Sequence, residues 1–254
     1  MPFTSFIYLL FRRRLRHHSP YLALAMPRSF SAPTVLPGSA LVHRLSAPAM
    51  PPSGAVLLLH GVGSNESDLL GLADGLADDV LIASLRAPLP LSPTQFAWFA
   101  VRFTPQGPQI EAAQAEASRQ ALIGFTQALQ AAYGIAPRRT VIAGFSQGGI
   151  MSASAALSMP ALYGGFAILS GRILPELAPH IADRAALSHL RALVAHGSYD
   201  SKLPPSWAER SDQWLAELGV NTTSRRYPID HGICAEEQRD WLQWISPWLQ
   251  EPTP

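Results

Sequence analysis

The chain has 254 residues, of which 48% are hydrophobic and 15% are charged, and its formal net charge at pH 7 is +1. This composition provides enough apolar material for a large core. It excludes global disorder, and it excludes binding to nucleic acid or to membranes through bulk charge. The single cysteine, Cys234, excludes an intrachain disulfide and a metal site built from several thiolates.

The first 34 residues differ from the rest of the sequence. The apolar stretch from Phe3 to Phe11 is too short to span a bilayer as a helix. The arginines at positions 12–14 follow this stretch, whereas a secretory signal places its positive charge before the apolar run. We therefore expect residues 1–34 to be a disordered leader, or to result from an upstream start codon with Met26 as the true start. The expected protein is cytoplasmic, without stable membrane insertion.

From residue 40 onward, short apolar runs alternate with segments of helical periodicity. The runs that predict buried strands are 55–59, 80–85, 140–145, 165–169 and 192–196, with a weaker one at 224–229. The segments that predict helices are 67–79, 110–133, 147–159, 207–218 and a C-terminal segment containing Trp241, Trp244 and Trp248. This alternation predicts one α/β domain over residues 35–254, with a mostly parallel sheet and helices on both faces.

Residues 86–109 interrupt the alternation. Prolines at positions 88, 90, 93, 105 and 108 predict a long, irregular excursion. Its apolar side chains suit a lid-like loop that walls an acyl pocket, with Trp98 and Phe99 as the candidate pocket residues. A hydrophobic loop packed onto the core is an equal alternative.

The most informative stretch is Gly144-Phe145-Ser146-Gln147-Gly148-Gly149, which matches the pattern G-x-S-x-G. The pattern directly follows an expected strand and directly precedes an expected helix of small residues, as a nucleophile elbow requires. Glycines allow the strand and the helix to approach closely, and the turn exposes the serine hydroxyl. Ser146 is therefore the candidate nucleophile.

A serine nucleophile needs a base and an acid, which follow it in this order on loops at the strand ends. His231 lies just after the last expected strand. This position favours it as the base over the other histidines that follow Ser146, at positions 180, 189 and 196. Asp200 follows the preceding strand, which favours it as the acid over Asp230 and Asp183. The loop His60-Gly61-Val62-Gly63 ends the first core strand. We expect the backbone N–H groups of Val62 and Gln147 to form the oxyanion hole, with His60 orienting the loop.

At these residues the sequence resembles the phospholipase/carboxylesterase family of α/β-hydrolases. The resemblance rests on Leu58-Leu59-His60-Gly61-Val62-Gly63, Arg86-Ala87-Pro88, Ala97-Trp98-Phe99, the elbow, and His196-Gly197 with Asp200. It covers about residues 40–250, and it implies an α/β-hydrolase fold, no cofactor or metal, a small-molecule ester substrate, and Ser146, Asp200 and His231 as the triad. Oligomeric state cannot be read from these residues, so a homodimer stays open.

Two departures from the family pattern bear on the substrate. Asp230 precedes the candidate base, where the family commonly has glycine, and the oxyanion loop continues as Ser64-Asn65-Glu66, unlike eukaryotic thioesterases. These departures favour a carboxylesterase acting on small to medium acyl chains. The alternatives are a thioesterase or lysophospholipase acting on long acyl chains, and a non-catalytic binding protein on a hydrolase scaffold.

Overall fold

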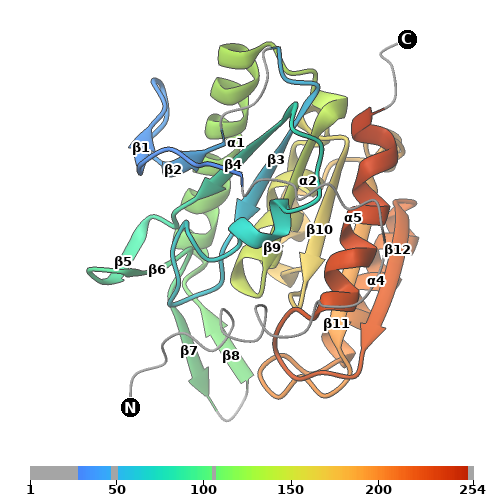
Figure 1. Ribbon diagram of the computed structural model, residues 1–254. Helices are drawn as coiled ribbons and strands as arrows, with labels where there is room; N and C mark the ends of the chain where they lie inside the picture. The colour runs from blue at the N-terminus through green and yellow to red at the C-terminus, as the bar shows by residue number, and fades with distance from the viewer. Residues whose placement is uncertain (1–27, 47–50, 105–106, 251–254) are drawn as a thin grey trace, which may run out of the picture.

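An eight-stranded sheet forms the centre of the protein, in the order β1-β2-β4-β3-β9-β10-β11-β12 (Figure 1). The computed structural model describes residues 28–46, 51–104 and 107–250. The strands are β1 (Thr34–Val35), β2 (Val42–Leu45), β3 (Gly54–Leu59), β4 (Val80–Leu85), β9 (Thr140–Phe145), β10 (Gly165–Leu169), β11 (Arg191–Gly197) and β12 (Asn221–Tyr227). β2 runs antiparallel to β1 and β4, and all other neighbours are parallel. The predicted α/β architecture is confirmed.

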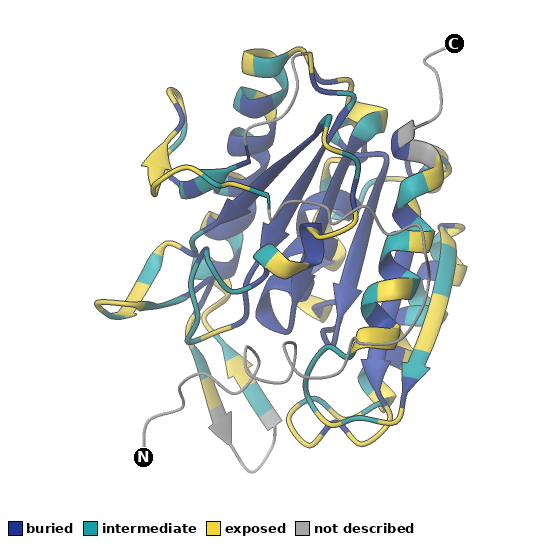
Figure 2. Ribbon diagram, in the orientation of Figure 1, coloured by how far each residue is buried: buried dark blue, intermediate teal, exposed yellow. Residues whose placement is uncertain are grey.

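Helices cover the sheet on both faces. One apolar core joins the sheet to α1 (Ala112–Tyr133), α2 (Gln147–Ser158), α3 (Arg184–Leu187) and α4 (Ser206–Leu218), while a second joins it to α5 (Ala235–Gln250) and the short helix η1 (Leu70–Ala73). Every residue of β3, β4 and β9 is buried, as the dark strands of Figure 2 show. Strands that are covered on both faces carry continuous apolar runs rather than alternating ones, which is why these runs stand out in the sequence.

The helix expected over residues 67–79 is reduced to η1, so this prediction is wrong in extent. Asp74 leaves the helical region with ψ +119°, and Gly75 has φ +97°. Left-handed backbone of this kind ends a helix. The apolar residues of the segment are nevertheless buried against the core that α5 covers, among them Leu69, Leu72 and Leu76.

The described residues of the segment 86–109 are not an irregular excursion, which corrects the expectation for this segment. They form two hairpins, β5 (Leu89–Ser92) with β6 (Gln95–Ala97) and β7 (Val101–Thr104) with β8 (Gly107–Ile110). Both hairpins stand outside the central sheet, so their prolines interrupt no hydrogen bonds of that sheet. The two short helical turns that flank the next strands are η2 (Pro137–Arg139) and η3 (Pro160–Leu162), and η4 (Pro175–His180) follows β10.

Residues 28–34, the last part of the predicted leader, are not separate from the domain, because the chain contacts it from Arg28 onward. The Arg28 side chain donates hydrogen bonds to the carbonyl oxygens of Leu76, Ala77 and Val80 at 2.7–2.8 Å, and β1 pairs with β2. Residues 1–27, including Met26, lie outside the described residues. Within the described ranges, no helix is both long and apolar enough to cross a membrane.

Candidate active site

Ser146 lies at the turn between β9 and α2, in a backbone conformation that few residues adopt. Its φ is +54° and its ψ is −116°. Its backbone N–H donates to the carbonyl of Leu169 on the neighbouring strand at 2.8 Å. A strained serine at a strand-to-helix turn, fixed by the sheet beside it, has the geometry of a nucleophile elbow.

Two glycines permit this turn. A Cβ atom at Gly144 would lie 2.2 Å from the backbone carbon of Gly148, and one at Gly148 would lie 1.9 Å from the carbonyl oxygen of Leu59. Any side chain at either position would therefore separate α2 from the strands that it contacts. This close approach is the reason that the elbow has glycine two residues before and two residues after the serine.

The structure brings the three predicted residues together. The Ser146 hydroxyl lies 2.9 Å from Nε2 of His231, and Nδ1 of His231 lies 2.7 Å from Oδ2 of Asp200. Because an ionised carboxylate only accepts hydrogen bonds, Nδ1 carries the proton and donates it to Asp200. Nε2 then has a free lone pair for the serine proton, so this histidine is oriented as a general base.

Asp200 is buried, and each of its oxygens is engaged. Oδ1 accepts the backbone N–H groups of Lys202 and Leu203 at 2.9 and 2.8 Å, while Oδ2 faces His231. His196 lies close by, with Nε2 3.3 Å from Oδ2 and 2.7 Å from the carbonyl oxygen of Leu203, to which it donates. Burial lowers the pKa of His196. This histidine, an alternative base in the sequence, therefore supports the Asp200 loop as a neutral residue.

Asp230 joins the loops that carry the acid and the base. Its Oδ1 accepts the backbone N–H groups of Ser201 and His231, both at 2.7 Å, and Oδ2 accepts the Ser201 hydroxyl at 3.2 Å. These hydrogen bonds, first the one from the Ser201 backbone, lower the pKa of Asp230. The residue that departs from the family pattern thus holds the two loops in register. No sequence pattern signals this role, because the two hydrogen bonds to Ser201 link residues 29 positions apart.

The other histidine alternatives lie away from the triad. His180 ends η4, with Nε2 3.8 Å from Glu116, and Nε2 of His189 contacts the carbonyl oxygens of Pro160 and Tyr163 at 3.1 Å. Neither has a serine hydroxyl as its partner. The sequence-based preference for His231 agrees with this placement.

The backbone N–H groups of Val62 and Gln147 are the expected oxyanion donors. Gln147 is the first residue of α2, so its N–H belongs to the unpaired first turn. In the described part of the chain, no hydrogen-bond acceptor faces either N–H group. Both N–H groups therefore stay the predicted oxyanion donors, and the positive end of the α2 dipole favours a negative charge at such a site.

His60 orients the oxyanion loop, as its position in the sequence predicts. Its Nδ1 donates to the carbonyl oxygen of Gly61 at 2.7 Å, and its Nε2 accepts the backbone N–H of Ala87 at 3.0 Å. Burial lowers its pKa to about 4. His60 is therefore neutral near pH 7, which the acceptor role of Nε2 requires.

The Gln147 side chain has a role that the sequence analysis missed. It accepts the backbone N–H of Trp98 at 2.8 Å and donates to the carbonyl oxygen of Phe99 at 2.7 Å. Trp98 in turn donates from Nε1 to the carbonyl oxygen of His60 at 2.9 Å. Trp98 and Phe99 are 0% and 2% exposed, so in this structure they belong to the core that supports the site. Their role in a substrate pocket stays a prediction.

The oxyanion loop is also tied to the β5–β6 hairpin. Gly63 donates its N–H to Phe96, and Asn65 donates from its side chain to Thr94. Arg86 makes two hydrogen bonds of 2.6 Å to the buried carboxylate of Glu66. Bidentate pairs of this kind are among the stronger hydrogen bonds in proteins. The segment that departs from eukaryotic thioesterases is thus the one that anchors the loop.

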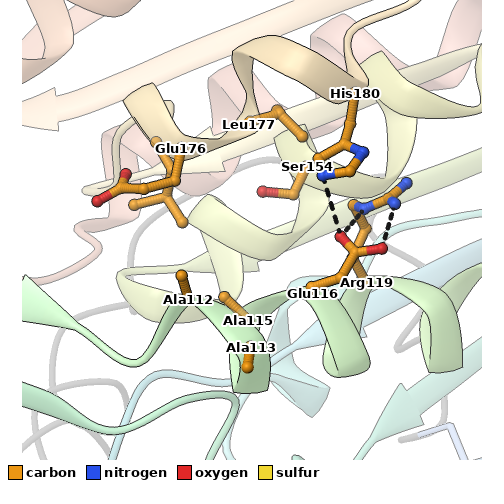
Figure 3. A pocket seen from close by; sticks show the side chains of 10 residues that line it. Ala112, Ala113, Ala115, Glu116, Arg119, Ser154, Glu176, Leu177 and His180 are labelled. Atoms are coloured by element: carbon orange, nitrogen blue, oxygen red, sulfur yellow. Dashed lines mark hydrogen bonds and ion pairs between the residues drawn. The ribbon is translucent and has the colours of Figure 1, made fainter.

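A cavity of about 280 Å³ lies between α1 and η4, and the three triad residues are not among those that line it. Figure 3 shows its polar side, where Arg119 and His180 face Glu116. The hydrogen bonds from Arg119 lower the pKa of Glu116 to about 2. In the described ranges, no group of three or more His, Cys, Asp or Glu side chains could hold a metal ion.

Glu237, in the first turn of α5, is a buried carboxyl group just beyond the His231 loop. It is 1% exposed, and among the described residues neither carboxyl oxygen has a hydrogen-bond partner. Burial raises its pKa from 4.5 to about 8, and the negative charge of the nearby Asp240 adds to this rise. The folded protein therefore keeps this proton up to about pH 8, whereas the unfolded chain loses it near pH 4.5. Stability from this group is complete below that lower pH and declines as the pH rises to about 8.

We expect Glu237→Gln, which mimics the protonated form, to increase the free energy of unfolding at pH 8.5 by on the order of 2–4 kcal/mol. At pH 4.5 the variant and the wild type should differ little. Urea denaturation at several pH values measures both quantities. The neighbouring exposed Glu236 supplies the control, since Glu236→Gln should not change the pH dependence. Equal pH profiles for wild type and Glu237→Gln would contradict the assignment.

Comparisons with known proteins identify the family and the fold of the chain. Residues 42–249 match the family model described as Phospholipase/Carboxylesterase. The chain is 28% identical over 233 residues to acyl-protein thioesterase 1 of Eremothecium gossypii, covering 83% of this chain and 94% of that protein.

Solved structures show the same fold. A carboxylesterase from Mesorhizobium loti superposes with a TM-score of 0.71 at 23% identity, covering 85% of this chain and 99% of that one. Acyl-protein thioesterase 2 of Zea mays gives a TM-score of 0.67 at 19% identity, covering 82% of this chain and 98% of that one. The chain has the α/β-hydrolase fold, and it belongs to the phospholipase/carboxylesterase family, a family of carboxylesterase- and thioesterase-type hydrolases.

Proposed function

We propose that the protein is a serine carboxylesterase that hydrolyses esters of small to medium acyl chains through an acyl-enzyme. The observation that carries this proposal is the continuous chain of hydrogen bonds from Ser146 through His231 to Asp200, with distances of 2.9 and 2.7 Å. The intact set of three residues also argues against a binding protein on a hydrolase scaffold.

In the first half of the reaction, His231 Nε2 takes the Ser146 proton while the serine oxygen attacks the ester carbonyl. The N–H groups of Val62 and Gln147 bind the oxygen that becomes negative, each contributing about 3–4 kcal/mol to transition-state stabilisation. Asp200 stabilises the imidazolium and holds its orientation. The imidazolium then gives its proton to the leaving alcohol, and the acyl group stays on Ser146.

In the second half, water replaces the alcohol. His231 takes a proton from the water as it attacks the acyl-enzyme, and the same two N–H groups bind the new oxyanion. Collapse releases the carboxylic acid and returns the proton to Ser146.

A long-chain thioesterase is the second candidate, because relatives such as that of Eremothecium gossypii are named acyl-protein thioesterases. Both candidates use the same triad, so substrate length distinguishes them. We expect wild-type protein to hydrolyse p-nitrophenyl esters with the largest kcat/KM for acyl chains between acetate and octanoate. A maximum at palmitate, or faster cleavage of palmitoyl thioesters than of any oxygen ester, would replace the proposal by the thioesterase. Absence of hydrolysis, together with no labelling of Ser146 by a fluorophosphonate, would favour the binding protein.

A further inference from the structure

Arg172 is a buried cation that lies just beyond the carboxyl end of a central strand of the sheet. It follows β10, which lies between β9 with Ser146 at its end and β11 with Asp200 beyond its end. The residue is 5% exposed. In the described part of the chain, its guanidinium has neither a carboxylate within ion-pair distance nor a hydrogen-bond acceptor. Burial lowers its pKa, and the exposed Glu176 opposes this effect only from a distance.

The residues before Arg172 touch both the nucleophile and the base loop. Leu169 accepts the backbone N–H of Ser146, and the Ser170 hydroxyl lies 3.4 Å from the carbonyl oxygen of Gly232, the residue after the base. At Gly171, a Cβ atom would lie 2.9 Å from the Ser146 carbonyl oxygen. The three residues that directly precede Arg172 therefore lie beside the nucleophile and the loop that carries the base.

Ser170 has a positive φ of +49°, which is sparsely populated for residues other than glycine. A strained residue persists where its surroundings determine it, and such residues gather at functional sites. The contacts of Leu169, Ser170 and Gly171 provide these surroundings. They fix the direction in which the chain presents Arg172.

An aromatic ring holds the Arg172 guanidinium. Its Cζ atom lies 4.2 Å from the ring centre of Trp207, in the first turn of α4 after the Asp200 loop. Arg210 contacts the same ring, with Cζ at 4.9 Å, but Arg210 is exposed. A guanidinium that stacks over an aromatic ring contacts the ring through its own flat face. The N–H groups around the rim of the guanidinium therefore stay available for hydrogen bonds. An unpaired, buried cation is costly unless a partner binds it, and the planar fork of arginine suits a carboxylate.

We propose that Arg172 binds a carboxylate carried by the ester substrate, so that the preferred substrates are anionic esters. This inference rests on the proposed esterase activity and specifies its substrate class. The carboxylate can stand on the acyl portion, as in a half-ester of a dicarboxylic acid, or on the alcohol portion. In both cases Arg172 makes paired N–H···O hydrogen bonds to it, while the triad attacks the neutral ester group.

Matched substrates test this directly. Monoethyl adipate and ethyl hexanoate differ in a carboxylate that replaces a methyl group on the acyl side; butyryl glycolate and ethyl butyrate differ in the same way on the alcohol side. Wild-type kcat/KM should be at least about 10-fold higher for the charged member of one pair, and the pair identifies the side. Arg172→Gln should lower kcat/KM for that substrate by about 10- to 100-fold, mainly through KM, and leave the neutral ester within about threefold. Arg172→Lys should retain part of the preference, and Arg210→Gln should retain all of it.

The outcomes separate the two proposals. If wild-type protein hydrolyses no ester, the esterase assignment fails. If it hydrolyses neutral esters without preferring either charged partner, only the carboxylate site fails. Equal losses on charged and neutral esters in Arg172→Gln, with normal circular dichroism, would make Arg172 a support for Trp207 and overturn the inference. Inhibition of the wild type needs no variant: free adipate should compete with ethyl hexanoate, and neutral adipamide should not. Equal inhibition by both would also overturn it.

Discussion

Replacement of Ser146 by alanine is expected to lower kcat for ester hydrolysis by at least ~10⁴-fold while the protein folds normally. The hydroxyl is the partner of His231 at 2.9 Å, and no other hydroxyl faces that nitrogen in the described part of the chain. The acyl-enzyme cannot form without it, so only stabilisation by the oxyanion donors remains. Steady-state kinetics on a p-nitrophenyl ester, with circular dichroism for the fold, measure both parts of the expectation.

Ser154→Ala is the matched control for this change. Ser154 lies on the same helix, and its hydroxyl donates only to the carbonyl oxygen of Ile150. We expect its kcat to stay near the wild-type value. Turnover by Ser146→Ala at a rate close to that of Ser154→Ala would contradict the assigned nucleophile.

The second large effect concerns the fold at the elbow. Gly148→Ala is expected to reduce the free energy of unfolding by more than about 4 kcal/mol, or to prevent folding. The added Cβ atom would lie 1.9 Å from the carbonyl oxygen of Leu59 and 2.5 Å from its carbon. Both are backbone atoms of a fully buried strand, so no side chain can move to relieve the contact. Urea denaturation, or soluble yield where the variant does not fold, measures the effect.

Gly124→Ala is the opposite case within a helix of the same layer. No atom lies within 4 Å of a Cβ at Gly124, which is in the interior of α1. Alanine favours the helix over glycine by about 0.5–1 kcal/mol, so this variant should be slightly more stable than the wild type. If the two variants had similar stability, close backbone approach would not be the reason for glycine at position 148.

The local sequence predicts those parts of the protein that adjacent residues determine. Continuous apolar runs identify β3, β4, β9 and β10, because a strand covered on both faces needs apolar side chains at every position. The elbow can be predicted equally well, since the serine, its flanking glycines and the following helix are consecutive in the sequence. Chain order then selects Asp200 and His231, and the structure brings both to Ser146.

In two segments the local sequence pattern predicted the wrong structure. The apolar spacing of residues 67–79 predicts a helix, but Gly75 and the extended Asp74 limit it to one short turn. The prolines of residues 86–109 predict irregular structure, yet two hairpins form beside the main sheet. Proline removes a donor only where the backbone N–H would have been used, and each strand of a two-stranded hairpin has one edge without a neighbouring strand, where no such N–H is needed.

By itself, the sequence determined the α/β class, the elbow and the choice of the three candidate triad residues, because each depends on contiguous residues or on their order along the chain. Only the tertiary structure decided the roles of Asp230, Glu237 and Arg172. Whether a charged group is held by backbone N–H groups, protonated or left without a partner depends on which distant loops meet it. These contacts have no period and no fixed spacing, because they form between residues that only folding brings together.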